Sequence, residues 1–428
     1  MKLVLENIGL LKKAEINLNH LTVIAGENDN GKSTVGKVIF CVIKAMSRYK
    51  EDLQESKEYK ITEKLNELFF LFRRILSNDA PSNIDLIRQF QLLLNSNKSL
   101  FFLQSFEDLV KQLKSQTHGF EPEEIIKFEK LSQEIKLIID TPENKIQSIE
   151  SALNKAFSAE FDQSILQNNK KTGLIQIYEN ELMLFELEVH GNNKIKLIKE
   201  PEPIEINDVT FIESPLVLSF HDLLIRSQSG FDMNKRGTNR LGIPYTTLHT
   251  KDLFDKLKER NILDINDFGV DQFVKKIIEG DINYHNDRRD FIFKRNQEEI
   301  SIKNTASGIK SFGLLQLLAK NGFIHKNAML VFDEPENHLH PKWQLKFAEL
   351  LVRLAGKGIF ILVSSHSPYM IEALKRYSEL SELEIEPRFY LAKDKVIENK
   401  NRLAEIFDAL SEPFEDFRRM DAEALKDE

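Results

Sequence analysis

The sequence predicts an α/β fold, with a mixed sheet and flanking helices arranged around a phosphate-binding loop. An apolar run at 21–25 leads into a glycine-bearing loop at 26–33, and a helix-like stretch follows at 35–45. This order is the context that phosphate-binding loops require. Apolar runs at 328–334 and 358–363 end in polar residues, as buried parallel strands do at the sheet edge where ligands bind. The length suggests roughly two or three domains.

The loop at 26–33 matches the pattern G-x-x-x-x-G-K-[ST] completely. Its glycines let backbone N–H groups face an anion together with the N-terminus of the following helix. Lys32 then reaches the β- and γ-phosphates, and the Ser33 hydroxyl ligates Mg²⁺. The sequence therefore predicts a nucleoside triphosphate site. The residues expected to contact the nucleotide are Gly26, Glu27, Asn28, Asp29, Asn30, Gly31, Lys32, Ser33 and Thr34.

The apolar run at 328–334 closes on two carboxylates. Asp333 is expected to hold Mg²⁺ directly or through water, and Glu334 to polarise the attacking water as a general base or by orientation. A strand that merely ends in two solvated acids is the alternative. The next strand ends close to His366, where a neutral imidazole can donate a hydrogen bond to a γ-phosphate and sense its loss. Glu334 and His366 are therefore the predicted catalytic residues.

Ser307 and Gly308 precede a helix predicted from Phe312 to Lys320. A hydroxyl, N–H groups and the helix dipole together make a second phosphate-facing device, although an ordinary N-cap has the same pattern. One triphosphate does not need two such devices from one chain. We therefore expect Ser307 and Gly308 to cap a nucleotide that another subunit holds.

These elements, in this order, resemble the ABC-type ATPase heads of the SMC, RecF and OLD group, in which two heads close around two ATP molecules. The resemblance assigns Lys32 to Walker A, Ser307 and Gly308 to the signature, Asp333 and Glu334 to Walker B, and His366 to the switch histidine. The run DEPENHLHP at 333–341 is similar to the D-E-P-E-x-x-L-H-P form of that group. Segments 3–9 and 14–18 are similar to its opening hairpin. The resemblance covers roughly 1–45 and 205–395, and it implies ATP and Mg²⁺ as cofactors.

Two segments of the head raise further questions about its ligands. No Q-loop glutamine is found, and the segment FIESP at 211–215 occupies its expected place, so a second contact to Mg²⁺ or water is unassigned. Glu336, His338 and His340 form a pattern that could be taken for a metal site. The resemblance instead places them in the loop after Walker B, at the interface between heads.

A large insertion separates the two halves of the head. From 51 to about 157 the apolar spacing is helical, and Pro81, Pro122 and Pro142 divide the segment into roughly four or five helices. No heptads run on, so a compact lobe is expected and not a coiled-coil arm. Shorter periodicity at 173–198 predicts a small antiparallel sheet. The expected divisions are 1–50 and 205–400 for the head, 51–165 for the helical insertion, 166–204 for the sheet, and 401–428 for a helical acidic tail.

The composition predicts a soluble cytoplasmic enzyme. Glu6 interrupts any signal-peptide pattern, and no apolar stretch approaches the ~20 residues of a membrane helix. Cys41 is the only cysteine, which excludes a disulfide framework and a thiolate metal site. A net charge of −8 argues against coating of nucleic acid but leaves a local basic groove open. The candidate patches are Lys235 and Arg236 with Arg240, and Arg288 with Arg289.

No effector is visible beside the head. The segment after His366 is shorter than the Toprim domain of OLD-family nucleases, and no HNH, zinc-cluster or PD-ExK pattern is found. The head and the tail at 399–414 are similar to the ATPase subunits of two-gene bacterial anti-phage systems, first Septu (PtuA-like) and second PARIS (AriA-like). This resemblance implies a homo-oligomer with a dimer of heads and a separate nuclease subunit, of HNH type in the Septu case.

The expected function is therefore an ATPase that converts ATP and water to ADP and phosphate and controls that effector, with no nuclease activity of its own. One alternative is a RecF-like repair or recombination ATPase that binds DNA through a basic surface. Its DNA affinity would fall with salt. The other is a structural regulator in which nucleotide holds an oligomer together with little turnover.

Overall fold

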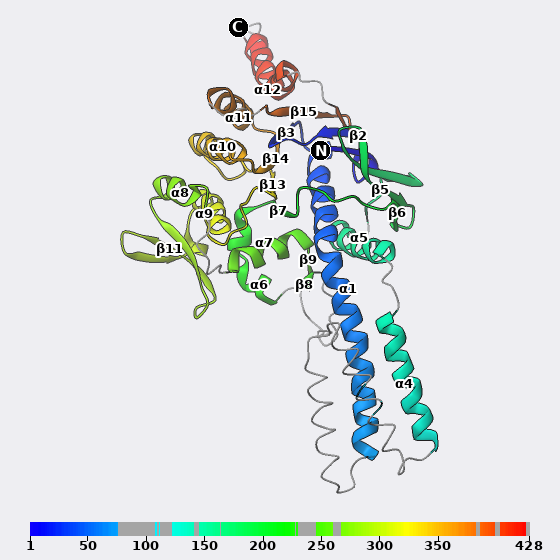
Figure 1. The fold of residues 1–428 in the computed structure, drawn as a ribbon. Coiled ribbons are helices and arrows are strands. Elements are labelled where there is room, and N and C mark those ends of the chain that lie inside the picture. Colours follow the sequence, from blue (N-terminus) through cyan, green and yellow to red (C-terminus); the bar gives the residue numbers. More distant parts are fainter. Residues whose placement is uncertain are drawn as a thin grey trace. The chain divides into compact units, whose positions relative to one another are not determined.

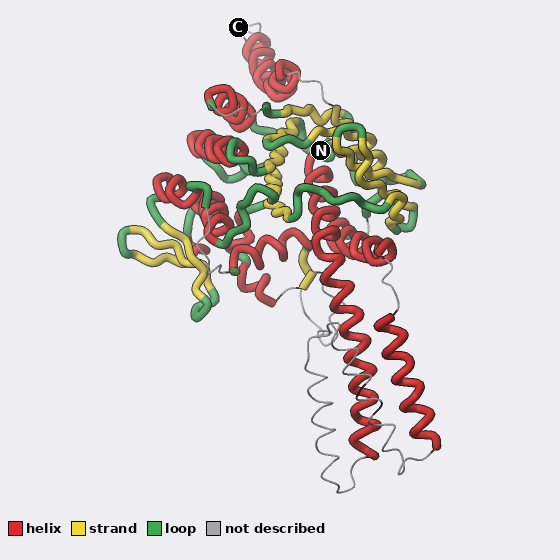
Figure 2. The backbone as a smooth tube through the Cα atoms, viewed as in Figure 1, coloured by secondary structure: helices red, strands yellow, loops and turns green. Residues whose placement is uncertain are grey.

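The computed structural model describes residues 1–75, 108, 111, 122–140, 145–162, 164–226, 228–229, 245–259, 267–381, 386–398 and 403–424. The chain divides into two compact units. Met1–Ser47 and Ile149–Glu428 form the larger unit, and Arg48–Ser148 form the smaller one. The larger unit carries the strands drawn as arrows in Figure 1 and in yellow in Figure 2.

The described part of the larger unit contains an eleven-stranded mixed sheet with the order β6-β5-β4-β1-β2-β16-β15-β3-β14-β13-β7. The strands are β1 (Lys2–Ile8), β2 (Leu11–Asn17), β3 (Leu21–Ala25), β4 (Thr172–Glu179), β5 (Leu182–His190), β6 (Ile195–Lys199), β7 (Asp208–Ile212), β13 (Ala328–Asp333), β14 (Phe360–Ser365), β15 (Arg388–Lys393) and β16 (Val396–Glu398). The α/β class and the three strands expected from unbroken apolar runs, now β3, β13 and β14, are confirmed.

Strands β7, β13, β14, β3 and β15 run parallel to one another. Every residue of β3, β13 and β14 is buried, which explains why the sequence is apolar along their whole length. On β14, Ser365 lies opposite Ala25 of β3, and Ser364 lies opposite Asp333 of β13. The carboxyl ends of these strands therefore meet at one edge of the sheet.

The other half of the sheet is mainly antiparallel. β1 pairs with β2, as the opening hairpin predicted, and on its other side with β4. The strands expected at 166–204 are antiparallel to one another, but they extend the main sheet through β1 and do not form a sheet of their own. Leu3 and Leu5 face Ile177 and Ile175 across this join, and all four are buried. Burial of these apolar pairs stabilises the long-range contact.

Shorter elements complete the described chain. A separate three-stranded antiparallel sheet is formed by β10 (Asp281–His285), β11 (Asp290–Arg295) and β12 (Glu298–Ser301), and β8 (Gln228–Ser229) pairs with β9 (Tyr245–Thr246). The α-helices are α1 (Lys32–Ile75), α4 (Pro122–Asp140), α5 (Lys145–Phe161), α6 (His221–Arg226), α7 (Leu248–Lys258), α8 (Val270–Ile278), α9 (Ser307–Lys320), α10 (Pro341–Ala355), α11 (Pro368–Leu380) and α12 (Leu403–Ala424). Short 3₁₀ turns occupy Pro215–Leu218 and Ile302–Asn304. Helix α12 lies where the helical tail was expected.

Helices cover both faces of the parallel strands, with α10 on one side of β13 and the first part of α1 on the other (Figure 1). Successive strand residues point to opposite faces, and β13 shows this directly. Phe332 packs edge-on against Phe347 of α10, with ring centres 5.6 Å apart. Val331 lies on the opposite face, so close to α1 that only Gly36 fits opposite it, because an added Cβ would lie 2.7 Å from the Val331 Cγ1 atom.

In the smaller unit, α1 continues without a break. The sequence suggested that this helix ends near residue 45, but the structure has one helix of 44 residues. The reason is visible in the composition, since neither glycine nor proline occurs between Gly36 and Ile75. Buried apolar residues continue along this part of α1 (Ile61, Leu65, Leu68 and Leu71) and along α4 (Phe128, Leu131 and Ile135). Lys64 of α1 pairs with Glu134 of α4 at 3.0 Å.

Of the three prolines expected to divide this insertion, Pro122 begins α4, and Pro81 and Pro142 lie outside the described residues. The described parts of 51–165 are helical up to Phe161, but the smaller compact unit ends at Ser148, so most of α5 belongs to the larger unit. The number of helices expected there depends in part on residues outside the described ranges.

We expect Gly36→Ala to destabilise the larger unit, although alanine favours a helix over glycine by about 1 kcal/mol. The new methyl group would lie 2.7 Å from both the Phe211 ring and Val331, which are buried and cannot move aside cheaply. Overpacking of this kind costs about 1–3 kcal/mol. The melting temperature should therefore fall. Gly191→Ala is the control, because its Cβ would meet nothing closer than a carbonyl oxygen at 3.6 Å. An unchanged or higher melting temperature for Gly36→Ala would contradict the packing argument.

Candidate functional site

A pocket of about 360 Å³ lies at the edge of the sheet where the parallel strands end. It brings together the loop after β3, the acids after β13 and one acid after β7. Its lining residues are Leu10, Asn28, Asp29, Asn30, Gly31, Lys32, Ser33, Thr34, Glu213, Asp333, Glu334 and Asn337. Most of the predicted nucleotide contacts therefore share one cavity with both predicted Walker B acids, although they are about 300 residues apart in sequence.

The phosphate-binding loop is held in a conformation that requires glycine. Gly26 has φ of +148° and Gly31 has φ of +82°, and a Cβ on Gly26 would collide with the Ala392 carbonyl oxygen. The Lys32 ammonium donates to the carbonyls of Gly26 and Glu27, both at 2.8 Å. Lys32 is also the first residue of α1, so the N-terminus of a long helix and a buried ammonium face the same pocket.

Asp333 and Ser33 form the part of the pocket suited to a divalent cation. Burial raises the pKa of Asp333, and hydrogen bonds from Ser364 and Ser33 only partly offset this effect. Ser364 on β14 donates its hydroxyl to Asp333 Oδ1. A carboxylate next to a hydroxyl is an oxygen donor set that Mg²⁺ prefers. The predicted metal residues therefore lie together.

Glu334 begins the loop after β13 with φ of +49°, a left-handed conformation that is costly for a residue with a side chain. Its N–H donates to the Ser364 carbonyl at 2.9 Å, which fixes this turn. Its Oε1 lies 3.6 Å from Lys32 Nζ and 3.2 Å from His366 Nδ1. Burial alone would raise the pKa of Glu334, but the hydrogen bond from Asn337 and the neighbouring His366 and Lys32 outweigh it and lower the pKa. Glu334 is therefore an ionised carboxylate at the pocket.

Glu336 has a role that the sequence did not reveal. Its Oε1 accepts hydrogen bonds from the Ser365 hydroxyl at 2.7 Å, the His366 N–H at 2.8 Å and the Ser367 N–H at 3.1 Å. This buried carboxylate thus holds the turn that presents His366. The metal-site interpretation of Glu336, His338 and His340 finds no support, since no group of metal-ligating side chains is found within the described ranges.

Ser307 and Gly308 do not line the pocket of their own chain. Ser307 is the first residue of α9, and the N-cap is Ala306, so the ordinary N-cap interpretation does not apply to Ser307. The Ser307 hydroxyl donates to the His338 carbonyl at 3.2 Å. A Cβ on Gly308 would lie 2.6 Å from the Trp343 ring, so glycine is needed for this close approach. The start of α9 is therefore fixed to the loop that follows Glu334.

Glu213 is the main residue that sequence reasoning missed. It follows the last residue of β7, in the segment expected to hold a Q-loop glutamine, and it lines the same pocket as Lys32 and Asp333. Its Oε2 lies 3.1 Å from His249 Nε2. Two signals were available in the sequence: the position of Glu213 at the end of a strand, and the missing Q-loop glutamine in the segment 211–215.

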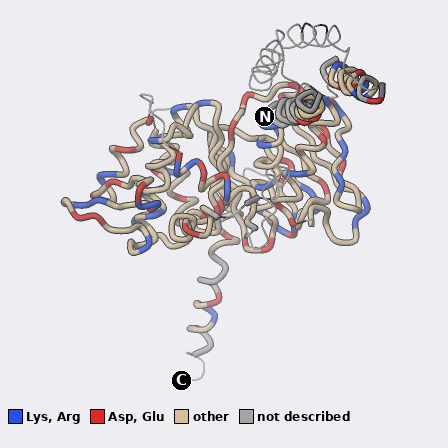
Figure 3. Tube along the Cα trace, turned by 90° about the horizontal axis from the view of Figure 1, so that it is seen from below, with Lys and Arg blue, Asp and Glu red and all other residues tan. Residues whose placement is uncertain are grey.

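One arginine of the candidate basic patches is paired with an acid. Arg288 pairs with Glu299 at 2.9 Å, and Arg289 lies in the turn between β10 and β11. Figure 3 shows basic and acidic positions interspersed along the described trace. Lys235, Arg236 and Arg240 lie outside the described residues. No helix in the described ranges combines the length and apolar character needed to cross a bilayer.

Comparison with known proteins gave a family and several solved structures. Residues 1–371 match the family AAA_15, described as AAA ATPase domain. Curated protein sequences gave no match.

Three solved structures illustrate the structural comparison. The SMC head domain from Thermotoga maritima is 11% identical over 91% of this chain and 93% of its own, with a TM-score of 0.35. The SmcHead bound to the C-winged helix domain of ScpA is 12% identical over 93% and 95%, with a TM-score of 0.38. The ATP-binding cassette of an ABC transporter in its ADP conformation is 12% identical over 96% of each chain, with a TM-score of 0.33.

The family match spans the phosphate-binding loop, both Walker B acids and His366. ATP binding follows from membership, and the pocket geometry agrees with it. The fold is an α/β P-loop ATPase head, and the chain belongs to the AAA_15 family of AAA ATPase domains.

Proposed function

We propose that this chain hydrolyses ATP in the pocket formed by the phosphate-binding loop and the acids after β13. The observation that carries the proposal is the position of Glu334. Its ionised carboxylate lies between the Lys32 ammonium and the His366 imidazole, at a pocket also lined by Ser33 and Asp333. A base at that position can orient a water molecule and accept its proton.

The chain's own residues divide the work. The N–H groups of the loop and Lys32 bind the phosphates, and Ser33 and Asp333 are the residues that would hold Mg²⁺. The cation would neutralise phosphate charge. His366 fixes the orientation of Glu334 through its Nδ1 contact, and Glu336 fixes His366 through its backbone N–H. The left-handed turn at Glu334 aims the carboxylate into the pocket.

Two substitutions test the chemistry. Lys32→Ala should remove most ATP binding, because the phosphates lose their charged partner. Glu334→Gln should still bind ATP but turn over roughly 100-fold more slowly, because an amide cannot accept the proton. Equilibrium binding of labelled ATP and phosphate release measure the two effects. Glu379→Gln on α11, an exposed carboxylate, is the control and should leave both unchanged. Hydrolysis at the wild-type rate by Glu334→Gln would remove Glu334 from its role.

We further propose that Ser307 and Gly308 complete the pocket of a second copy. The supporting observations are that Ser307 lies outside its own chain's pocket and that it does not act as an N-cap. A site built from two chains would make hydrolysis depend on a head-to-head dimer.

Mixing two inactive variants tests this arrangement. Ser307→Arg should block closure through bulk and charge while leaving ATP binding to Lys32 intact. The Lys32→Ala chain should lose ATP binding but keep the Ser307 that completes the site of its partner. A mixed dimer has one intact composite site, so the mixture should recover part of the activity that each variant lacks, up to roughly a quarter of the wild-type rate if the subunits pair at random. If dimers form in the mixture and no activity returns at any ratio, the two-chain site is excluded.

We also propose, from the resemblance to anti-phage ATPases, that the ATP state controls a separate nuclease, of HNH type if the system is Septu-like. The unit at Arg48–Ser148 supplies none of the residues that line the described pocket, which makes it the candidate for docking that effector. A ligand controls such a partner only through different affinities for its two states.

The purified chain alone should not cut plasmid or phage DNA with Mg²⁺ or Mn²⁺. Expressed with its neighbouring gene, it should lower phage plating, and Lys32→Ala or His366→Ala should restore plating by removing ATP binding or its coupling. Plaque counts and gel assays measure these effects. Metal-dependent cleavage by the isolated chain that survives Lys32→Ala would contradict the separate effector. Salt-sensitive DNA binding without phage protection would instead favour the repair alternative.

A further inference from the structure

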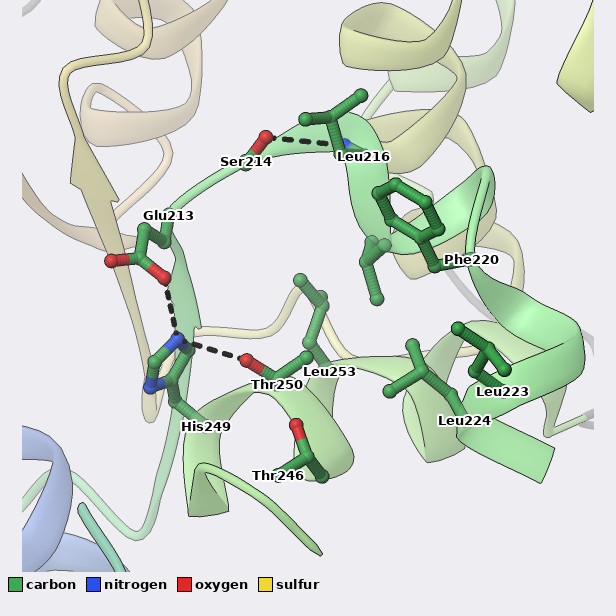
Figure 4. Close-up of a pocket in the computed structure, with 11 residues that line it drawn as sticks. Glu213, Ser214, Leu216, Phe220, Leu223, Leu224, Thr246, His249, Thr250 and Leu253 are labelled. Carbon is green, nitrogen blue, oxygen red and sulfur yellow. Dashed lines mark hydrogen bonds and ion pairs between the residues drawn. The ribbon is translucent and has the colours of Figure 1, made fainter. Parts of the chain in front are cut away.

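The Glu213 side chain lines the phosphate pocket and a neighbouring pocket. This second pocket has a volume of about 340 Å³. Figure 4 shows the second pocket. One carboxylate oxygen of Glu213 contacts His249, and the other oxygen points away from the imidazole. Glu213 is half exposed, with 52% of its side chain accessible, so its carboxylate is not enclosed in the interior.

His249 is held from both sides by carboxylates. Its Nδ1 lies 2.7 Å from Glu160 Oε1, its Nε2 lies 3.1 Å from Glu213 Oε2, and its side chain is 2% exposed. Burial alone would lower the pKa of His249, but the hydrogen bonds and charges of Glu160 and Glu213 outweigh it and raise the pKa to about 9. The buried His249 ring therefore bridges helix α5, helix α7 and the end of β7 through its contacts with Glu160 and Glu213.

Glu160 holds the His249 ring on the side opposite to Glu213. Its side chain is completely buried, accepts the His249 backbone N–H at 3.2 Å and lies 3.7 Å from Lys37 of α1. One fully buried acid thus contacts both the backbone and the ring of His249. These contacts fix the orientation of the imidazole that faces Glu213.

The two elements that carry His249 and Glu213 are also tied together at a second point. Lys256 of α7 donates to Asp208 Oδ2 at 2.7 Å and to the Val209 carbonyl at 2.9 Å, at the beginning of β7. Lys44 of α1 pairs with Asp208 at 2.9 Å and with Asp252 of α7 at 2.8 Å. Helix α7 therefore cannot shift along β7 without breaking these partly buried ion pairs, which restricts the distance from His249 to Glu213.

β7 pairs with β13 so that Ile212 lies opposite Phe332, which places the following Glu213 and Asp333 at the same edge. We propose that His249, supported by Glu160, is a positioning residue that holds Glu213 on the metal side of the phosphate pocket, where Glu213 serves as a carboxylate beside Asp333. This inference rests on the proposed ATP site, since it assigns Glu213 to the hydration sphere of the cation that accompanies the nucleotide. Removing an outer partner of a metal site typically costs 10–100-fold in affinity or activity.

The test measures how much Mg²⁺ tightens nucleotide binding. Dissociation constants for a non-hydrolysable ATP analogue are measured with Mg²⁺ and with EDTA, and kcat and KM for ATP are measured in parallel. The Mg²⁺ gain is the factor by which the dissociation constant falls when Mg²⁺ replaces EDTA. Glu213→Gln should reduce this gain roughly 10-fold, with little change in the dissociation constant measured in EDTA and a fall in kcat. His249→Gln should act in the same direction but less, because Glu213 remains present and is only less well placed.

A double-variant cycle separates positioning from general damage. If His249 acts through Glu213, adding His249→Gln to Glu213→Gln should not reduce the Mg²⁺ gain further. His221→Gln is the matched control, because His221 is equally buried and likewise lies near two carboxylates, both 3.1 Å from its Nε2. His221 lines neither the phosphate pocket nor the second pocket. His221→Gln should lower the melting temperature without changing the Mg²⁺ gain.

The outcomes are distinct. An unchanged Mg²⁺ gain in Glu213→Gln overturns the inference, whether or not His249→Gln folds. If the Mg²⁺ gain falls equally in His221→Gln and His249→Gln, the positioning role of His249 is overturned and only a structural role is left. A wild-type chain that binds the analogue with a Mg²⁺ gain but releases no phosphate from ATP would contradict the proposed hydrolysis and not this inference.

Discussion

The register of β14 between β3 and β13 is the constraint on which the site depends. Opposite Ser365 lies Ala25, the last residue before the phosphate-binding loop, and opposite Ser364 lies Asp333. A shift of one residue would turn these side chains to the other face and separate the loop from the acids. Because every residue of these strands is buried, such a shift would also exchange the side chains that pack on the two covered faces of the sheet. The same burial that stabilises the sheet therefore fixes the geometry of the pocket.

The pocket at this edge of the sheet must also accommodate three acidic side chains. Asp333, Glu334 and Glu213 line one cavity, where like charges in low dielectric repel. Two of these acids have cationic or imidazole neighbours: Glu334 lies near Lys32 and His366, and Glu213 lies against His249. The pKa of Asp333 is instead raised, chiefly by burial and further by the neighbouring acids. Asp333 is the carboxylate without a cationic side chain among these contacts, and it is the one for which a bound cation would be the natural partner.

The sequence predicted what depends on local pattern. Apolar runs gave β3, β13 and β14, and the loop motif gave the contacts around Lys32. What it did not predict depends on distant residues. The pairing of β4 with β1 follows from burial of Ile175 and Ile177 against β1. The contacts of Glu213 and Glu336 become visible only when strand ends meet. The sequence places Glu336 in the run at 333–341 and Glu213 in the segment at 211–215, but neither pattern identifies the partners of these acids. The long course of α1 was readable from the missing glycines and prolines, but the expected domain boundary at 50 obscured it.

The loop after β13 links the reacting centre to the start of α9. It begins at Glu334, whose Oε2 accepts a hydrogen bond from Asn337, and one residue later the His338 carbonyl accepts the Ser307 hydroxyl. Both Glu334 and His338 have positive φ, so the loop is strained at both points. It ends at His340, whose Nδ1 accepts the Lys342 N–H at the start of α10. A change in the contacts of Glu334 would therefore reach Ser307 through one short, tightly held segment. If Ser307 faces the nucleotide of a second chain, this loop and the hydrogen bond from Ser307 to His338 form a short route by which hydrolysis in one pocket alters the contacts in the other.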